Sequence, residues 1–178
     1  MIGMGAIKDE VSQVISVQRE RFKLAEVFTI SRGSRTEAKV LTVRGTRNGV
    51  TGWGECVPYA RYNETLDSVT EEIAGLPADV TRDALQDLLP AGAARNAVDC
   101  ALWDLEAKSS GKRVWELADL PAPRPEITAY TLSLASPEEM EAQARKHAFR
   151  PLLKIKLGTP DDMPRLEAVR RGAPDARI

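Results

Sequence analysis

The stretch Leu152–Gly158 reads LLKIKLG and places two lysines two residues apart inside an apolar run that ends at a glycine. Side chains alternate between the two faces of a β-strand, so Lys154 and Lys156 are predicted to share one face while the apolar residues occupy the other. A neighbouring ammonium group and burial both lower the pKa of a lysine, and such a lysine can act as a base near neutral pH. The alternative is an edge strand whose lysines prevent aggregation. The spacing alone leaves both interpretations open.

The segments around this stretch predict alternating strands and helices. Ser136, followed by a proline and acidic residues, is typical of a helix start. Strands that alternate with helices through short links form a parallel sheet with right-handed crossovers. Two such units and the start of a third cannot close a sheet, so we expect these residues to be an N-terminal portion of a longer protein. The expected strands lie at 126–134, 152–157 and 176–178, and the expected helices at 137–148 and 160–171.

The chain before residue 120 predicts a different architecture, an antiparallel meander followed by helices. Asn48-Gly49 is a hairpin signal because both turn positions need a positive φ. Three prolines between Leu120 and Pro125 mark the expected boundary between a domain of residues 1–122 and one of residues 123–178. Apolar periodicity places strands at 11–22, 38–46 and 50–56, and helices at 65–75, 81–89, 93–109 and 114–117.

Composition and charge narrow the classes of function. Of the 178 residues, 43% are hydrophobic and 29% are charged, as in ordinary globular proteins. A net charge of −1 gives no basic field for nucleic acid or an anionic membrane, and no apolar run approaches the roughly 20 residues of a membrane span. The two cysteines fit a reducing cytoplasm, and with a single histidine they do not suffice for a zinc site. Cys100, in an apolar helical stretch, is expected in the core.

Four segments carry a resemblance to a known family. They are ISRGSR at 30–35, GECVPYARYNE at 54–64, LPAGAARNAVDCALWD at 89–104 and LKIKLG at 153–158. With the meander, the prolines and the strand–helix units, they resemble the enolase superfamily. Within its muconate-cycloisomerase-like branch they resemble the dipeptide epimerases of the L-Ala-D/L-Glu type, over about residues 12 to 178. The resemblance implies an α+β capping domain followed by the start of a (β/α)₈, TIM-like barrel, whose active site lies at the carboxyl ends of its strands.

The resemblance also implies a reaction and residues for it. The reaction removes the proton α to a carboxylate in a small dipeptide such as L-Ala-L/D-Glu, with Mg²⁺ holding the enediolate, and lysine bases with Mg²⁺ are this superfamily's known pattern. Lys156 would be the base on one face of the α-carbon, and Lys154 would steady the substrate carboxylate. Thr131 would line the substrate site, and Arg35 would hold a dipeptide carboxylate through a two-pronged contact. Each of the four also has a plainer interpretation, as a strand former or a solvated cation.

Other polar residues are weaker candidates. Arg32 shares with Arg35 the polar loop expected at residues 31–35. Glu55 and Tyr59 lie in a loop that would face the barrel mouth, whereas Arg61 and Glu64 are expected to form a surface pair. Asp99 and Asp104 are five residues apart on a helix, do not share a face, and are expected to cap or pair with cations. His147 is expected to supply a favourable positive charge at a helix end.

The resemblance implies metal ligands that these residues lack. They would be carboxylates at the ends of the third, fourth and fifth barrel strands, beginning just after Ile178, and the second catalytic lysine would also come later. Asp161, Asp162 and Asp175 lie on or before helices and are not substitutes, so residues 1–178 alone are expected to be inactive. The competing interpretations are a non-catalytic binding or assembly module, and a cycloisomerase or an epimerase of other specificity. Family members often assemble, so a homo-oligomer is among the expected partners.

Overall fold

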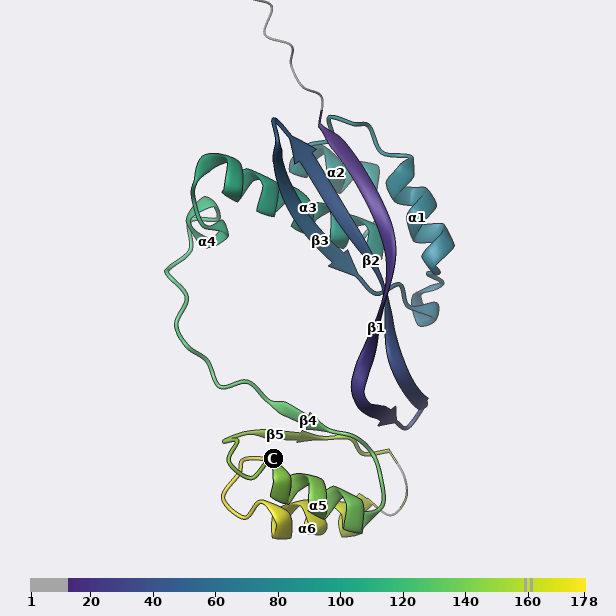
Figure 1. Ribbon diagram of the computed structural model, residues 1–178, viewed down its shortest axis with the longest axis vertical. Coiled ribbons are helices and arrows are strands. Elements are labelled where there is room, and N and C mark those ends of the chain that lie inside the picture. The colour runs from purple at the N-terminus through teal and green to yellow at the C-terminus, as the bar shows by residue number, and fades with distance from the viewer. Residues whose placement is uncertain (1–12, 159, 161) are drawn as a thin grey trace, which may run out of the picture. The chain divides into compact units, whose positions relative to one another are not determined.

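The computed structural model describes residues 13–158, 160 and 162–178, and the chain divides into two compact units. One unit holds the chain up to Arg21 together with residues 39–123, and the other holds residues 22–38 and 124–178. The two longest strands, β1 (Val14–Ile30) and β2 (Gly33–Arg47), contribute to both units (Figure 1). The expected domain boundary between residues 122 and 123 stays a prediction.

The first unit contains a sheet of three strands in the order β1-β2-β3, with β3 at Val50–Cys56, and parts of β1 and β2 extend into the second unit. Strands β2 and β3 are antiparallel, and Asn48 and Gly49 in the turn between them both have a positive φ, which confirms the expected hairpin. The strands expected at 11–22 and 38–46 are longer than predicted, because β1 and β2 run on to a turn at Ser31 and Arg32. Residues 11 and 12 lie outside the described part of the chain.

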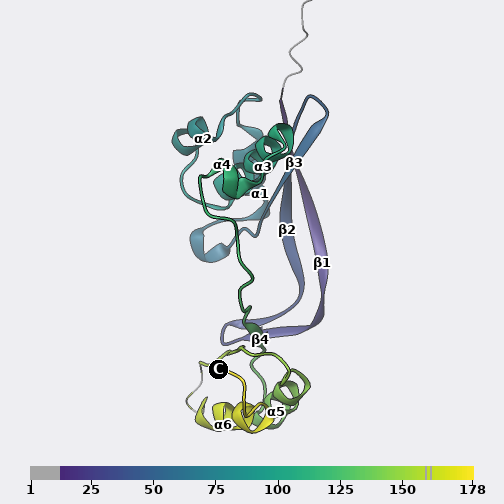
Figure 2. The same ribbon diagram turned by 90° about the vertical axis from the view of Figure 1, so that its left-hand side faces the viewer.

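Three helices lie on one side of this sheet, as Figures 1 and 2 show. Thr65 and Thr81 cap the first two of them, accepting hydrogen bonds from the backbone N–H groups of Ser68 and Ala84. The helices are α1 (Leu66–Ala74), α2 (Arg82–Leu88) and α3 (Ala93–Ser110), and they are followed by the short α4 (Val114–Leu117).

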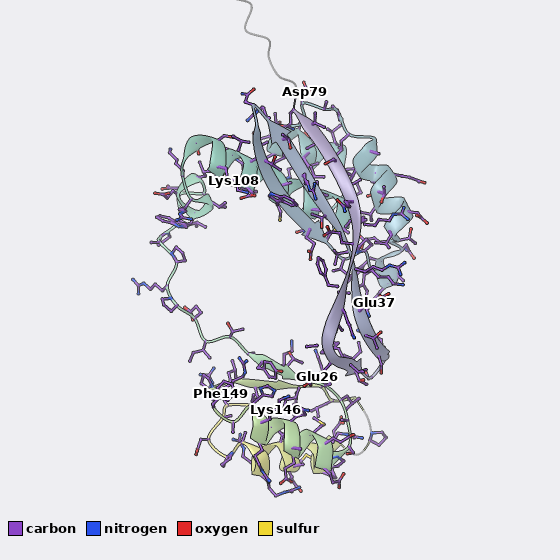
Figure 3. The ribbon with its side chains drawn as sticks, in the orientation of Figure 1. Glu26, Glu37, Asp79, Lys108, Lys146 and Phe149 are labelled. Carbon is purple, nitrogen blue, oxygen red and sulfur yellow. The ribbon has the colours of Figure 1, made fainter. Side chains whose placement is uncertain are left out.

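Helix α3 packs directly on the backbone of β3. A Cβ added to Gly52 or Gly54 would overlap backbone atoms of α3, so glycine is needed for this close approach. The carboxylate of Asp104 accepts the Trp53 N–H at 2.8 Å and pairs with Lys108 Nζ at 2.6 Å (Lys108 is labelled in Figure 3), which confirms the expected ion pairing. Lys108 also donates to the Thr51 carbonyl at 3.1 Å. These two side chains therefore satisfy backbone groups on the edge of β3 that is not paired with β2.

The second unit contains two parallel strands and two helices, β4 (Tyr130–Leu132), α5 (Pro137–Lys146), β5 (Leu153–Ile155) and α6 (Asp162–Gly172). Leu152 also forms a parallel bridge with Arg177, so the start of a third strand is confirmed. The core of this unit is apolar and includes Leu132, Met140, Leu153 and Val169. Both strands are shorter than the predicted 126–134 and 152–157, because the parallel register supplies only three paired positions.

The expected burial of Cys100 and the expected charge of His147 are both wrong. Cys100 is exposed, because the buried positions of α3 are its neighbours Ala97, Val98 and Ala101. His147 is 9% exposed, and its ring lies 4.1 Å from that of Tyr130 between centroids. Burial is the main cause that lowers the pKa of His147, so it is not the favourable helix-end charge expected.

Among the described residues, no helix is both long and apolar enough to cross a bilayer.

Candidate active site

The parallel strands bring two of the predicted site residues side by side. Thr131 on β4 is the register partner of Lys154 on β5. Leu132 and Leu153, which flank these positions, are buried in the core of the unit, and Ile155 packs against it. Since side chains alternate along a strand, Thr131 and Lys154 lie on the opposite face of the sheet, and the predicted alternation over 153–155 is confirmed.

Lys156 comes directly after β5, at its carboxyl end. Its side chain is half-buried, whereas Lys154 is exposed. The predicted strand continued to Leu157, but that residue is 44% exposed and lies outside the ladder. The carboxyl ends of parallel strands are where α/β barrels place catalytic groups, so the position of Lys156 suits a base.

The end of β1 and the turn that follows it contact the segments after both parallel strands. After β4, the Leu134 N–H donates to the Thr29 carbonyl at 3.1 Å, and Ser133 Oγ donates to the Val27 carbonyl at 3.3 Å. After β5, Gly158 lies so close to Ser31 that an added Cβ would be 2.7 Å from the Ser31 Cβ. The turn is therefore fixed at the carboxyl ends of β4 and β5.

Arg32 and Arg35 belong to this turn and to the start of β2, and both side chains are exposed. Residues 22–38 and the lysine strand belong to one compact unit. The loop expected at 31–35 is wrong from Gly33 on, because β2 begins there and Arg35 lies in that strand. The segment with Arg32 and Arg35 and the Lys-x-Lys strand, far apart in the sequence, are parts of the same compact unit.

A cavity of about 470 Å³ runs along β4 in this unit, between residues of the β1 end, β4 and α5. Thr131 lines it, together with other side chains that can hydrogen-bond. In the described structure Lys154, Lys156 and Arg35 are not part of its lining. The polar residues of the lining are Glu26, Thr29, Thr131, Ser133, Glu139 and Gln143.

Asp162 has a positioning role that the sequence did not reveal. Its carboxylate accepts the N–H of Gly158 at 2.8 Å and lies 3.6 Å from an Arg165 guanidinium nitrogen. Arg165 in turn donates to the Ala135 carbonyl at 2.9 Å. This network joins the segment after β5 to the segment after β4. The available signal was a glycine followed four residues later by an aspartate that opens a helix.

Glu55 and Tyr59 line a second cavity, of about 610 Å³, in the first unit. Glu55 lies in β3 and not in the expected loop, because it is paired with Thr42 of β2. Glu64 is not a surface partner of Arg61 as expected, because its carboxylate accepts the backbone N–H groups of Tyr59, at 3.1 Å, and Ala93, at 2.7 Å. It thereby fixes the loop after β3 to the start of α3. Cys56 also lines this cavity, and burial, followed by the nearby negative charges of Glu64 and Glu55, raises its pKa to about 11. The Cys56 thiol is therefore protonated at neutral pH and is no nucleophile.

The residues that the structure describes do not fit a Mg²⁺ site. Mg²⁺ requires several oxygen ligands in near-octahedral geometry. Within residues 13–158, 160 and 162–178, no three side chains of His, Cys, Asp or Glu come together in a way that could hold a metal ion. The expected metal ligands beyond Ile178 stay a prediction.

The fold and the site define the class of protein. The sequence profile of the mandelate racemase / muconate lactonizing enzyme N-terminal domain matches residues 12–118. The chain belongs to this family, and it carries the α+β capping domain of the enolase superfamily, as predicted.

Several of the proteins that the chain resembles are named dipeptide epimerases. The chain is 40% identical to the L-Ala-D/L-Glu epimerase of Escherichia coli, over 93% of this chain and 54% of that protein. A crystal structure from Agrobacterium tumefaciens, described as an enolase family member with homology to dipeptide epimerases and bound to sodium and L-Ala-L-Glu, is 53% identical with a TM-score of 0.88. It is matched over 93% of this chain and 52% of that one.

A dipeptide epimerase from Enterococcus faecalis, solved with Mg and L-Leu-L-Tyr, is 26% identical, with a TM-score of 0.79 over 92% of this chain and 50% of that one. The chain thus spans about half the length of the relatives it matches.

Proposed function

We propose that the complete protein containing these residues epimerises a dipeptide such as L-Ala-L-Glu or L-Ala-D-Glu by 1,1-proton transfer. The observation that carries the proposal is one local structure. The Lys-x-Lys strand, with Thr131 beside Lys154, ends next to the turn at Ser31 and Arg32, and β2, which carries Arg35, begins just after this turn. Similar proteins include one named L-Ala-D/L-Glu epimerase and one described as having homology to dipeptide epimerases. Recycling of cell-wall peptides is the cellular role that suits this substrate.

Lys156, Lys154, Thr131 and Arg35 each have a defined role in this reaction. Lys156 takes the proton from one face of the α-carbon, and the electron pair of the broken C–H bond moves onto the carboxylate. Lys154 faces that carboxylate as a counter-charge, while Thr131 lines the substrate site beside it. Arg35 holds the other carboxylate of the dipeptide through two parallel hydrogen bonds. A second acid or base, on the opposite face and outside these residues, returns the proton and completes the inversion.

Mg²⁺ is the proposed cofactor, with ligands beyond Ile178. The ion would supply positive charge to the enediolate, as expected for this superfamily. The proposed compartment is the cytoplasm, where the free thiols of Cys56 and Cys100 would remain reduced.

The test is a panel of dipeptides incubated with the complete protein and Mg²⁺, with the configuration at each α-carbon read by chiral chromatography. The panel should contain L-Ala-L-Glu, L-Ala-D-Glu, an apolar pair such as L-Leu-L-Tyr, and N-acetylated glutamate. Inversion of the alanyl-glutamate pair ahead of the others supports the proposal. Inversion of another member alone would replace the proposed specificity, and no inversion of any member would support a non-catalytic module.

A further inference from the structure

Gly158 stands where the turn of the β1–β2 hairpin meets the end of the lysine strand. Its φ is +147°, a conformation that residues with a Cβ rarely adopt. An added Cβ would lie 2.7 Å from the Ser31 Cβ and 3.2 Å from the Ser31 Oγ. A contact of 2.7 Å between two carbon atoms is far inside their optimal separation of about 3.5–4.0 Å. Any side chain at position 158 would therefore displace the turn or the segment after β5.

The segment after β5 is the less free of the two to move. The N–H of Gly158 donates to the Asp162 carboxylate at 2.8 Å, and Asp162 opens α6. Arg165, on the same helix, holds the Ala135 carbonyl at 2.9 Å. Moving Gly158 away from Ser31 would strain this network, whereas Ser31 lies in an exposed two-residue turn.

The structure assigns Gly158 the role of a positioning residue. Because it has no side chain, the turn at Ser31 can lie close to the end of the lysine strand, and Arg32 and Arg35 are held near this end. This inference rests on the proposed function, in which Arg35 binds the glutamyl carboxylate and Lys156 is the base. Gly158 itself touches no reacting atom. It controls how closely the turn at Ser31 and Arg32 approaches the carboxyl end of β5.

The test compares four variants of the complete protein. Gly158→Ala adds the clash, and Gly158→Ala with Ser31→Gly removes the Cβ that it meets. Gly111→Ala is the control for a positive φ, because Gly111 has φ +70° and nothing within 4 Å of an added Cβ. The single variant Ser31→Gly corrects for the extra freedom of a glycine in the turn. Two readouts are measured on each protein: amide hydrogen exchange of residues 27–37, and KM and kcat for the alanyl-glutamate pair.

Gly158→Ala is expected to speed exchange in residues 27–37 several-fold and to raise KM about tenfold, with kcat changed less than about threefold, as for lost substrate positioning. The double variant is expected to recover most of the way, but not fully, to the level of Ser31→Gly, because the strained φ at position 158 remains. Gly111→Ala is expected to match the wild type in this segment. Unchanged exchange in Gly158→Ala, or faster exchange that Ser31→Gly does not reverse, would overturn the inference. A wild-type protein without epimerisation would contradict the proposed function instead, and the exchange data would still decide the role of Gly158.

Discussion

His147 shows how tertiary packing reverses the chemistry expected of a residue from its place in the chain. At a helix end it reads as a stabilising cation, but the fold buries it against Tyr130, with Phe149 6.2 Å away between ring centroids. Neither ring nitrogen has a hydrogen-bond partner in the described structure. Burial lowers the pKa of His147, the charges of Lys146 and Arg150 lower it further, and only Glu26 acts in the opposite direction. Lys146 is itself paired with Glu26 at 2.9 Å (both labelled in Figure 3).

Stability is therefore expected to fall in mild acid. The unfolded chain binds a proton at His147 below its ordinary pKa of 6.5, and the folded chain resists it, so acid favours unfolding. Above pH 6.5 the protonation of His147 does not reduce the free energy of unfolding. As the pH falls from 6.5 toward the lowered pKa of the folded state, this free energy decreases by no more than about 1.4 kcal/mol per pH unit. Urea unfolding followed by circular dichroism between pH 5 and 8 measures it.

His147→Phe is the matched control, because it keeps an aromatic ring in the stack and removes the titrating group. His147 is the only histidine of the chain, so this variant should flatten the slope between about pH 5.5 and 6.5. Equal slopes in the two proteins would show that His147 is not the group responsible.

At the level of elements, the sequence predicts helices better than strands. The caps at Thr65, Thr81 and Ser136 are local signals, and all three helices begin there as expected. The lengths of β4 and β5 depend instead on where a partner strand lies, which no local pattern records. The same holds in the site. Period-two alternation predicts the faces of Leu153 and Lys154, but the contact of Gly158 with Ser31 joins distant segments and could be found only in the structure.

The close packing of α3 on β3 predicts that a side chain at Gly54 destabilises the fold. A Cβ at Gly54 would overlap the Ala97 carbonyl oxygen, so Gly54→Ala should lower the free energy of unfolding by about 3 kcal/mol or more. Urea unfolding followed by tryptophan fluorescence is the measurement, since Trp53 and Trp103 lie on these two elements. Gly75→Ala is the control, because Gly75 has a helical φ of −79° and its nearest neighbour would be at 3.6 Å. It should change stability by less than about 1 kcal/mol. Comparable losses in both variants would contradict this view of the interface.

At the level of the whole molecule, the chain supplies one part of the proposed catalytic machinery. The described residues include the Lys-x-Lys strand and the segment with Arg32 and Arg35, but no group of side chains that fits a metal ion. The resemblance to the dipeptide epimerases could be drawn from sequence segments, and it is confirmed. The metal ligands and the second base that the resemblance implies stay predictions.

Removal of metal tests the proposed cofactor. Epimerisation by the complete protein should fall to background in excess EDTA and return when Mg²⁺ is added beyond the chelator, because charge on the enediolate would otherwise be unopposed. Residues 1–178 expressed alone should show no epimerisation with Mg²⁺. Full activity in EDTA would contradict Mg²⁺ dependence, and activity of residues 1–178 alone would contradict the assignment of essential groups beyond Ile178.

The role of Lys156 is the central claim, and the rate of dipeptide epimerisation by Lys156→Ala in the complete protein tests it most directly. Loss of a general base is expected to lower kcat by about 10²- to 10⁴-fold with the melting temperature retained. The control is Lys112→Ala, which removes an exposed lysine just after α3 and should leave kcat unchanged. An epimerisation rate in folded Lys156→Ala equal to that of the wild type would show that another group removes the α-proton.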